Sequence, residues 1–197
     1  MDTFLEFGGW FDQLFRLKSD GRYVTFKTAL NIIHQTNQPP IIVETGTIRQ
    51  EEDYGAGYST VIFGEYVNHY GGHITTIDIE WNNMEVCKRV TDVYKGQIDY
   101  IVDDSLHALT LLKAPIDLLY LDSLDTPIGD NEDATPAQEH NLKEFKIVEH
   151  LLHPKSVVLI DDNNFVNGGK SRLTKQYLAE KGWRVLINAQ QTLWIKK

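Results

Sequence analysis

The sequence predicts an α/β fold in which a mostly parallel sheet carries helices on both faces. From Pro40 onward, short apolar runs alternate with segments of helical periodicity, which is the pattern of a parallel sheet. The first run, Ile41–Thr45, passes directly into glycine-rich turns at Gly46 and at residues 55–57. The last two runs lie so close together that they predict a terminal hairpin.

Two helices are expected before the first strand, at Trp10–Lys18 and Arg22–Thr36. In the second, apolar side chains recur at i, i+3, i+7 and i+10, which places them on one helical face. The proline pair at 39–40 ends it, because proline cannot continue a helix. We expect one domain, with residues 1–38 as a helical extension and residues 39–197 as the α/β core.

The strands of the core are expected at Ile41–Thr45, Ile74–Ile79, Ile98–Val102, Ile116–Leu121, Ser156–Ile160, Trp183–Ile187 and Gln191–Ile195. The helices between them are expected at Ser59–Tyr70, Asn83–Lys95, Ser105–Leu112, Thr135–Leu152 and Lys170–Lys181. Gly71 suits the end of the first of these helices. Ser105 is expected to cap the third helix, and Thr135 to begin a capping box in the fourth.

Composition excludes several classes of partner. The formal net charge of −9 argues against a nucleic-acid backbone, whose binding needs clustered Lys and Arg. No apolar run is long enough to span a membrane, and no signal-peptide pattern opens the chain. The single cysteine, Cys87, fits a reducing compartment, so we expect a cytoplasmic protein.

Acidic residues stand at the end of every predicted parallel strand. They are Glu44, Asp78, the pair Asp103-Asp104, Asp122 and the pair Asp161-Asp162. A single Asp there is an ordinary helix cap, but five such ends indicate a ligand site, because ligands bind at this edge of parallel sheets. Residues 117–139 also carry seven acids; this stretch is either a solvated acidic loop or a mouth that holds a divalent cation.

The acid after the second strand predicts an adenosyl ligand, because such an acid hydrogen-bonds ribose hydroxyls in dinucleotide-binding folds. That residue is Asp78. The glycine fingerprint for pyrophosphate is incomplete, since Thr60 stands where the third glycine is expected. With Glu44 beside the turn, a cationic or zwitterionic group is favoured over a pyrophosphate.

These motifs resemble the class I S-adenosylmethionine-dependent methyltransferases, and most closely the catechol O-methyltransferase-like and macrocin O-methyltransferase-like small-molecule enzymes. The residues that carry the resemblance are Glu44-Thr45-Gly46, Gly57-Tyr58-Ser59-Thr60, Ile77-Asp78-Ile79-Glu80, Asp103-Asp104-Ser105, Tyr120-Leu121-Asp122 and Leu159-Ile160-Asp161-Asp162-Asn163. The resemblance covers residues 40–197. It implies a Rossmann-like, doubly wound, seven-stranded sheet of order 3-2-1-4-5-7-6, with the last strand antiparallel.

The resemblance also implies roles for single residues. Asp78 would bind the ribose, Asp104 and Ser105 the adenine, and Gly46 with Ser59 the methionine part. The whole set of cofactor residues it suggests is Glu44, Thr45, Gly46, Gly57, Ser59, Thr60, Asp78, Asp104, Ser105 and Asp122. In metal-dependent members, positions matching Asp122, Asp162 and Asn163 bind Mg²⁺, which would orient an acceptor hydroxyl and lower its pKa.

The base that removes the acceptor's proton is left open. Besides Asp122, the candidates are Asp125, which stands where the catechol enzyme has a lysine, and His140 at the start of the next helix. Which of Asp161 and Asp162 faces a metal is also open. The Gly168-Gly169-Lys170 segment is interpreted as a turn, because it lacks the Walker pattern of a phosphate loop.

We therefore expect an enzyme that methylates a small hydroxylated molecule, a sugar or a natural-product scaffold, at oxygen. The alternatives are a nicotinamide-dependent oxidoreductase of the same α/β class and a methyltransferase-like protein that binds a ligand without turnover. The aromatic-rich N-terminal helices either cover the acceptor site, pair two subunits as a homodimer, or pack on the edge of the sheet.

Overall fold

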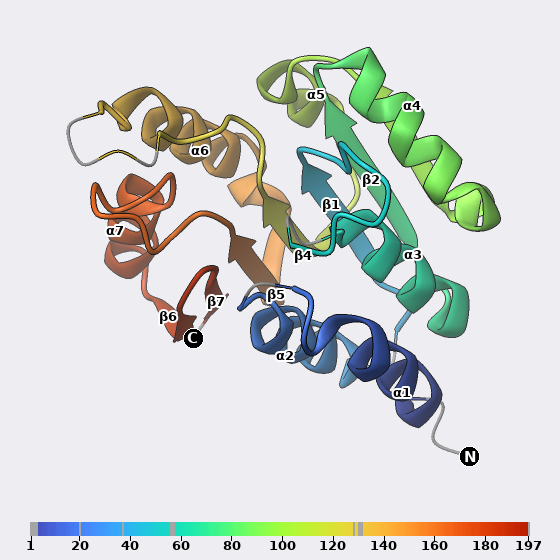
Figure 1. Cartoon of the computed structure of the whole chain (residues 1–197). Coiled ribbons are helices and arrows are strands. Elements are labelled where there is room, and N and C mark those ends of the chain that lie inside the picture. Colours follow the sequence, from blue (N-terminus) through green and yellow to red (C-terminus); the bar gives the residue numbers. More distant parts are fainter. Residues whose placement is uncertain are drawn as a thin grey trace.

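The computed structural model describes residues 4–19 (side chains from Phe7), 21–36, 38–55, 58–127, 129 and 132–196. A seven-stranded sheet of order β3-β2-β1-β4-β5-β7-β6 forms the centre (Figure 1). Its strands are β1 Ile41–Thr45, β2 His73–Asp78, β3 Ile98–Val102, β4 Ile116–Leu121, β5 Leu152–Ile160, β6 Trp183–Asn188 and β7 Thr192–Lys196. Only β7 runs antiparallel to its neighbours, so the predicted order and the terminal hairpin are confirmed.

Helices cover both faces of the sheet. They are α1 Phe4–Phe15, α2 Tyr23–His34, α3 Ser59–Tyr70, α4 Trp81–Val90, α5 Ser105–Leu111, α6 Thr135–Val148 and α7 Arg172–Glu180, with short 3-10 turns η1 Asp92–Gln97 and η2 Glu149–Leu151. The first four helices pack on one face, and α5, α6 and α7 pack on the other. None of the helices in the described part of the chain is long and apolar enough to cross a membrane.

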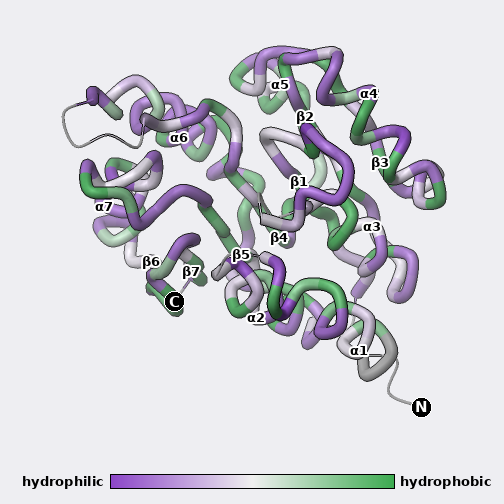
Figure 2. Tube along the Cα trace, in the orientation of Figure 1, coloured by the Kyte–Doolittle hydropathy of each residue, from purple (hydrophilic) through white to green (hydrophobic). Residues whose placement is uncertain are grey.

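The two faces of the sheet separate by the alternation of side chains along each strand. Ile42 and Leu118 point to the α2 and α3 side, whereas Val43 and Leu119 point to the α5 and α6 side. Strands buried on both faces are rich in apolar residues, and much of β4 and β5 accordingly colours as hydrophobic in Figure 2. The segment that leaves β5 toward α7 is mainly hydrophilic in the same view.

The N-terminal helices pack their aromatic side chains into the core. Phe7, Phe11 and Phe15 of α1 are each at most 1% exposed. The rings of Phe7 and Phe11, and of Phe11 and Phe15, are stacked at 5.8 and 5.3 Å, as expected for neighbours one helical turn apart. Helix α1 begins and ends earlier than the predicted helix at Trp10–Lys18. Helix α2 packs on the face of the sheet over β4, β5 and β7, and α1 packs against α3, so the expected packing on the edge of the sheet is wrong.

The end of α6 and the start of β5 are both predicted too late in the chain. The expected helix Thr135–Leu152 ends at Val148, and β5 already begins at Leu152. The strand starts early because Ser156 Oγ donates to Ile116 O and accepts from His153 N–H, which ties the first part of β5 to β4.

The predicted helix caps also differ from the observed ones. Asp104, and not Ser105, caps α5, since its side chain accepts from the N–H of Leu106. Helix α6 has no side-chain cap at its N-cap residue, and Thr135 is its first residue rather than a capping-box start.

Candidate active site

Two adjoining cavities open at the carboxyl ends of the parallel strands. The first cavity, of about 260 Å³, is lined by residues that include Arg22, Gln50, Asp53, Ser59, Asp122 and Asp162. The second cavity, of about 350 Å³, is lined by residues that include Asp78, Ile79, Asn83, Asp104, Ser105 and His140. Gly46, Arg49 and Asp125 line both cavities and so form the boundary between them.

Gly46 holds this boundary because no larger residue fits there. Its φ is +80°, and a Cβ on it would lie 2.3 Å from the carbonyl oxygen of Asp122. The backbone on either side is fixed, since Gly46 N–H donates to Ile77 O and Asp122 N–H donates to Thr45 O. The ends of β1 and β4 thus approach each other directly, which glycine alone permits.

Asp78 fixes the edge of the second cavity at the end of β2. Its carboxylate accepts from the backbone N–H of Thr47 at 3.1 Å and of Glu80 at 2.8 Å. The side-chain amide of Asn83 lies 3.3 Å from both carboxylate oxygens. Ile77, Ile79 and Leu124 add apolar wall to this cavity. A carboxylate beside apolar surface suits a nucleoside, which presents hydroxyls on one side and a flat ring on the other.

His140 lies in the second cavity and not beside Asp122. Its Nε2 is 3.0 Å from Ser105 Oγ and 3.3 Å from a carboxylate oxygen of the buried Glu144. The hydrogen bond with Glu144 raises the pKa of His140 above its ordinary value. This position suits a contact with the nucleoside and does not support the predicted role of His140 as the base for an acceptor in the first cavity.

Glu44 lies under the first cavity rather than in it. Its carboxyl is fully buried and accepts hydrogen bonds from the hydroxyls of Ser59, Thr60 and Thr76. Burial raises the pKa of Glu44 to about 7, although these three hydroxyls counteract the effect. Because Ser59 lines the cavity, Glu44 positions it from below.

The remaining predicted cofactor residues divide in the same way. Thr45 and Thr60 are fully buried and line neither cavity, whereas Gly46, Asp78, Asp104, Ser105 and Asp122 do. The predicted contact at Gly57 lies outside the described residues.

Lys170 joins the two carboxylates at the base of the first cavity. Its ammonium lies 2.9 Å from Asp122 Oδ1 and 3.2 Å from Asp162 Oδ2, and the residue is 1% exposed. Burial alone would lower the pKa of Lys170, but the adjacent Asp122 and Asp162 raise it above its ordinary value, so the group remains an ammonium. Asp122 also accepts from the hydroxyl of Tyr120 at 3.0 Å.

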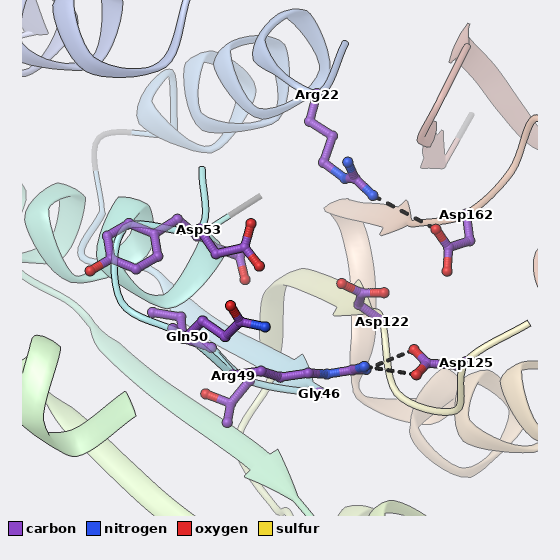
Figure 3. A pocket seen from close by; sticks show the side chains of 12 residues that line it. Arg22, Gly46, Arg49, Gln50, Asp53, Asp122, Asp125 and Asp162 are labelled. Atoms are coloured by element: carbon purple, nitrogen blue, oxygen red, sulfur yellow. Dashed lines mark hydrogen bonds and ion pairs between the residues drawn. The ribbon is translucent and has the colours of Figure 1, made fainter. Parts of the chain in front are cut away.

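Arg22, from the start of α2, closes the same cluster from the other side. Its Nε donates to Asp161 at 2.8 Å, and its Nη2 lies 3.7 Å from Asp162 (Figure 3). Asp161 is fully buried and also accepts from Tyr120 and Gln191. Asp161 therefore faces inward, and Asp162 is the member of the pair that faces the cavity.

The three predicted metal ligands are not assembled. Asp122 and Asp162 come together, but Asn163 donates to Asn188 Oδ1 and Ala189 O. Its own Oδ1 accepts from Ser171 Oγ at 2.8 Å and Lys175 Nζ at 2.6 Å. Within the described ranges, no group of three or more His, Cys, Asp or Glu side chains could hold a metal ion. The amide of Asn163 is engaged elsewhere, and the ammonium of Lys170 lies between the carboxylates of Asp122 and Asp162. The residue set therefore does not fit Mg²⁺.

The loop between β1 and α3 forms the outer wall of the first cavity. Arg49 makes two hydrogen bonds of 2.7 Å to Asp125, which cross between the cavities (Figure 3). These bonds lower the pKa of Asp125, which makes it a weaker base than an unpaired aspartate. Tyr54 packs edge-on against Phe15 of α1. Arg49, Gln50 and Asp53 of this loop thus form a wall of the site.

Two basic residues of the site were missed from the sequence. Arg22 lies in the N-terminal extension, far along the chain from Asp161, and no motif links the two. Lys170 follows a glycine pair that indicated a turn, and the turn is observed, with φ of +91° at Gly168 and +61° at Gly169. The carboxylate partners of Lys170 could not be inferred from that glycine pattern.

Comparison with known proteins gives a family for this arrangement. Residues 53–163, more than half of the chain, match the family described as "Methyltransferase domain". No curated relative matches the chain.

Solved structures with similar folds are methyltransferases of low sequence identity. The SAH-bound methyltransferase PaMTH1 of Podospora anserina aligns with 100% of this chain and 88% of its own, at 16% identity and a TM-score of 0.60. The O-methyltransferase NovP covers 100% of both chains at 11% identity and a TM-score of 0.70. CalS11, a TDP-rhamnose 3'-O-methyltransferase, covers 88% of this chain and 77% of its own at 14% identity and a TM-score of 0.61. At these identities the likeness shows a shared fold.

Proposed function

Because the chain belongs to the methyltransferase-domain family, we propose that it uses S-adenosylmethionine to methylate an oxygen of a small hydroxylated molecule. Family membership favours methyl transfer over the hydride transfer of a nicotinamide enzyme. The acceptor we favour is a sugar or a natural-product scaffold, bound in the first cavity while the nucleoside lies in the second.

The observation that carries this proposal is the meeting of the two cavities at Gly46. S-adenosylmethionine consists of a nucleoside and a charged methionine joined at the sulfur that bears the methyl group. The second cavity offers Asp78 to the ribose and apolar surface to the adenine. Past Gly46, the methyl group would point into the first cavity. The SAH held by PaMTH1 supports a cofactor of this kind for the shared fold.

The chemistry of the first cavity favours a hydroxylated acceptor. Its wall contains the carboxylates of Asp53, Asp122 and Asp162 and the amide of Gln50, which accept hydrogen bonds from hydroxyl groups. An acidic surface of this kind repels phosphate backbones and gives little apolar contact for a lipid chain. NovP and CalS11, which share the fold, are both described as O-methyltransferases.

In the proposed reaction, a hydroxyl of the acceptor hydrogen-bonds to Asp122, which lies directly beside Gly46. The hydroxyl oxygen attacks the methyl carbon in line, and the C–S bond breaks with its electron pair moving to the sulfur. The proton of the hydroxyl passes to Asp122, because Asp125, the carboxylate at the boundary itself, is held by Arg49. A Mg²⁺ ion would polarise the same hydroxyl, but the residues do not fit the ion, so no step passes through a metal.

Calorimetry and a turnover assay test the proposal. We expect SAH and S-adenosylmethionine to bind one per chain, and Asp78→Ala to weaken both. A panel of sugars, nucleotide sugars and phenols would then be screened for release of SAH. Absence of cofactor binding would contradict the proposal. Binding with no turnover on any hydroxylated acceptor would favour the alternative of a ligand-binding protein without catalysis.

A further inference from the structure

The ammonium of Lys170 occupies the position between Asp122 and Asp162 that a shared cation would take. Both carboxylates line the first cavity, whereas the lysine lies beneath them and is 1% exposed. We propose that Lys170 is a built-in cation that replaces a divalent metal ion in this site, and that removing its side chain opens a metal site there.

The turn before α7 fixes the lysine in this place. A Cβ on Gly169 would lie 1.8 Å from the carbonyl oxygen of Asp162, so the backbone can pass there only as glycine. The next residue, Lys170, donates its own N–H to the same carbonyl at 3.1 Å. The lysine is therefore attached to Asp162 through both its backbone and its side chain. The turn fixes where its side chain starts, and burial of the residue holds the ammonium against the carboxylates.

Charge and size then exclude a second cation. Mg²⁺ requires close contact with several oxygens at about 2.0–2.1 Å and gives up its water reluctantly. The oxygens it would use are those already within 3.2 Å of the Lys170 ammonium. Asp161, the third carboxylate of the cluster, is paired with the buried Arg22. A dication placed there would face an ammonium at close range, with no uncompensated pair of carboxylates to balance it.

This inference assigns Lys170 a positioning role, since it acts on the acceptor through Asp122 and Asp162. The identity of the acceptor that those carboxylates bind rests on the proposed function. Metal binding by the pair does not depend on that function, and a direct binding measurement can test it. Failure of the proposed function would appear as absent cofactor binding, whereas failure of this inference would appear as metal binding to the wild type or as a folded Lys170 variant that binds no metal.

The experiment titrates the full chain with Mn²⁺ and follows binding by electron paramagnetic resonance and by calorimetry. We expect no saturable Mn²⁺ binding to the wild type at millimolar metal, and an SAH affinity that a chelator leaves unchanged. Lys170→Ala should gain one saturable Mn²⁺ site, with an upward shift in melting temperature when the metal is added. The double variant Lys170→Ala/Asp162→Asn should lose that site again.

Lys175→Ala is the matched control, because this lysine contacts Asn163 instead of the two carboxylates. It should gain no Mn²⁺ site. Circular dichroism shows which variants are folded, and Lys170→Ser replaces Lys170→Ala if the latter is not. Saturable one-to-one binding of Mn²⁺ to the wild type overturns the inference, as does a folded Lys170 variant that binds no metal. If neither Lys170 variant folds, the wild-type titration alone tests the inference, which requires that the wild type shows no saturable Mn²⁺ binding.

Discussion

Raising the pH from about 5.5 to about 8 should remove the stability that the buried carboxyl of Glu44 contributes. Burial raises the pKa of its carboxyl from an ordinary 4.5 to about 7. Because the folded pKa lies above the unfolded one, the stabilisation is fully present below the unfolded pKa and is lost as the pH rises through the folded pKa. At about 1.4 kcal/mol per tenfold change in the acid constant, the full loss is about 3 kcal/mol, of which about 2 kcal/mol falls between these two pH values.

Glu44→Gln isolates this contribution. The amide oxygen can accept from Thr60 and Thr76, and the amide nitrogen can donate to Ser59, as the neutral acid does. We therefore expect the variant to lose about 2 kcal/mol less than the wild type over the same pH range. Urea unfolding at both pH values, with the slopes compared, measures the difference. A gap between wild type and variant that stays the same at both pH values would refute the reasoning.

Three further substitutions test the site from different sides. Gly46→Ala places a Cβ against the carbonyl of Asp122 in a left-handed conformation, and urea unfolding should show a loss of at least about 3 kcal/mol. Asp78→Ala should weaken SAH binding by about tenfold or more in calorimetry, since it removes a charge-assisted acceptor worth roughly 1.5–3 kcal/mol; unchanged affinity would move the nucleoside elsewhere. Arg22→Met leaves Asp161 buried without its charged partner, so the loss of stability should be about 3–5 kcal/mol in thermal or urea unfolding.

The strands and the terminal hairpin could be predicted from local patterns, whereas the order of the strands came from the family resemblance. The apolar runs of β1, β4 and β5 are buried on both faces, and the hairpin of β6 and β7 follows from the short connection between them. Where the prediction failed, a tertiary contact decided the boundary. Ser156 ties residues that continue the helical pattern to the edge of β4, and this makes them a strand.

The position of the site could also be predicted, but the task of each acid could not. Backbone direction alone brings the strand ends to one edge, so the position of Asp78 at the cavity could be predicted from the order of the strands. The other acids differ from one another in how deeply they are buried. Glu44 stands two residues before the cavity-lining Gly46 and lies beneath the cavity, while Asp161 turns inward to a residue of the N-terminal extension. Side chains at adjacent positions in a strand point to opposite faces of the sheet. The sequence does not show on which face the hydrogen-bonding or charged partner of each acid lies.

The cation at the Asp122–Asp162 pair is the clearest case of information that a motif cannot carry. Two carboxylates at neighbouring strand ends predict a cation on chemical grounds, because buried charges of one sign require compensation. The same pair would accept Mg²⁺, a guanidinium or an ammonium. The turn that follows β5 determines which cation binds. Gly169 allows the backbone to contact the carbonyl of Asp162, and this places the side chain of Lys170 beneath the two carboxylates. A glycine pair before a lysine therefore indicates a cation position here only through the two carboxylates that the lysine contacts.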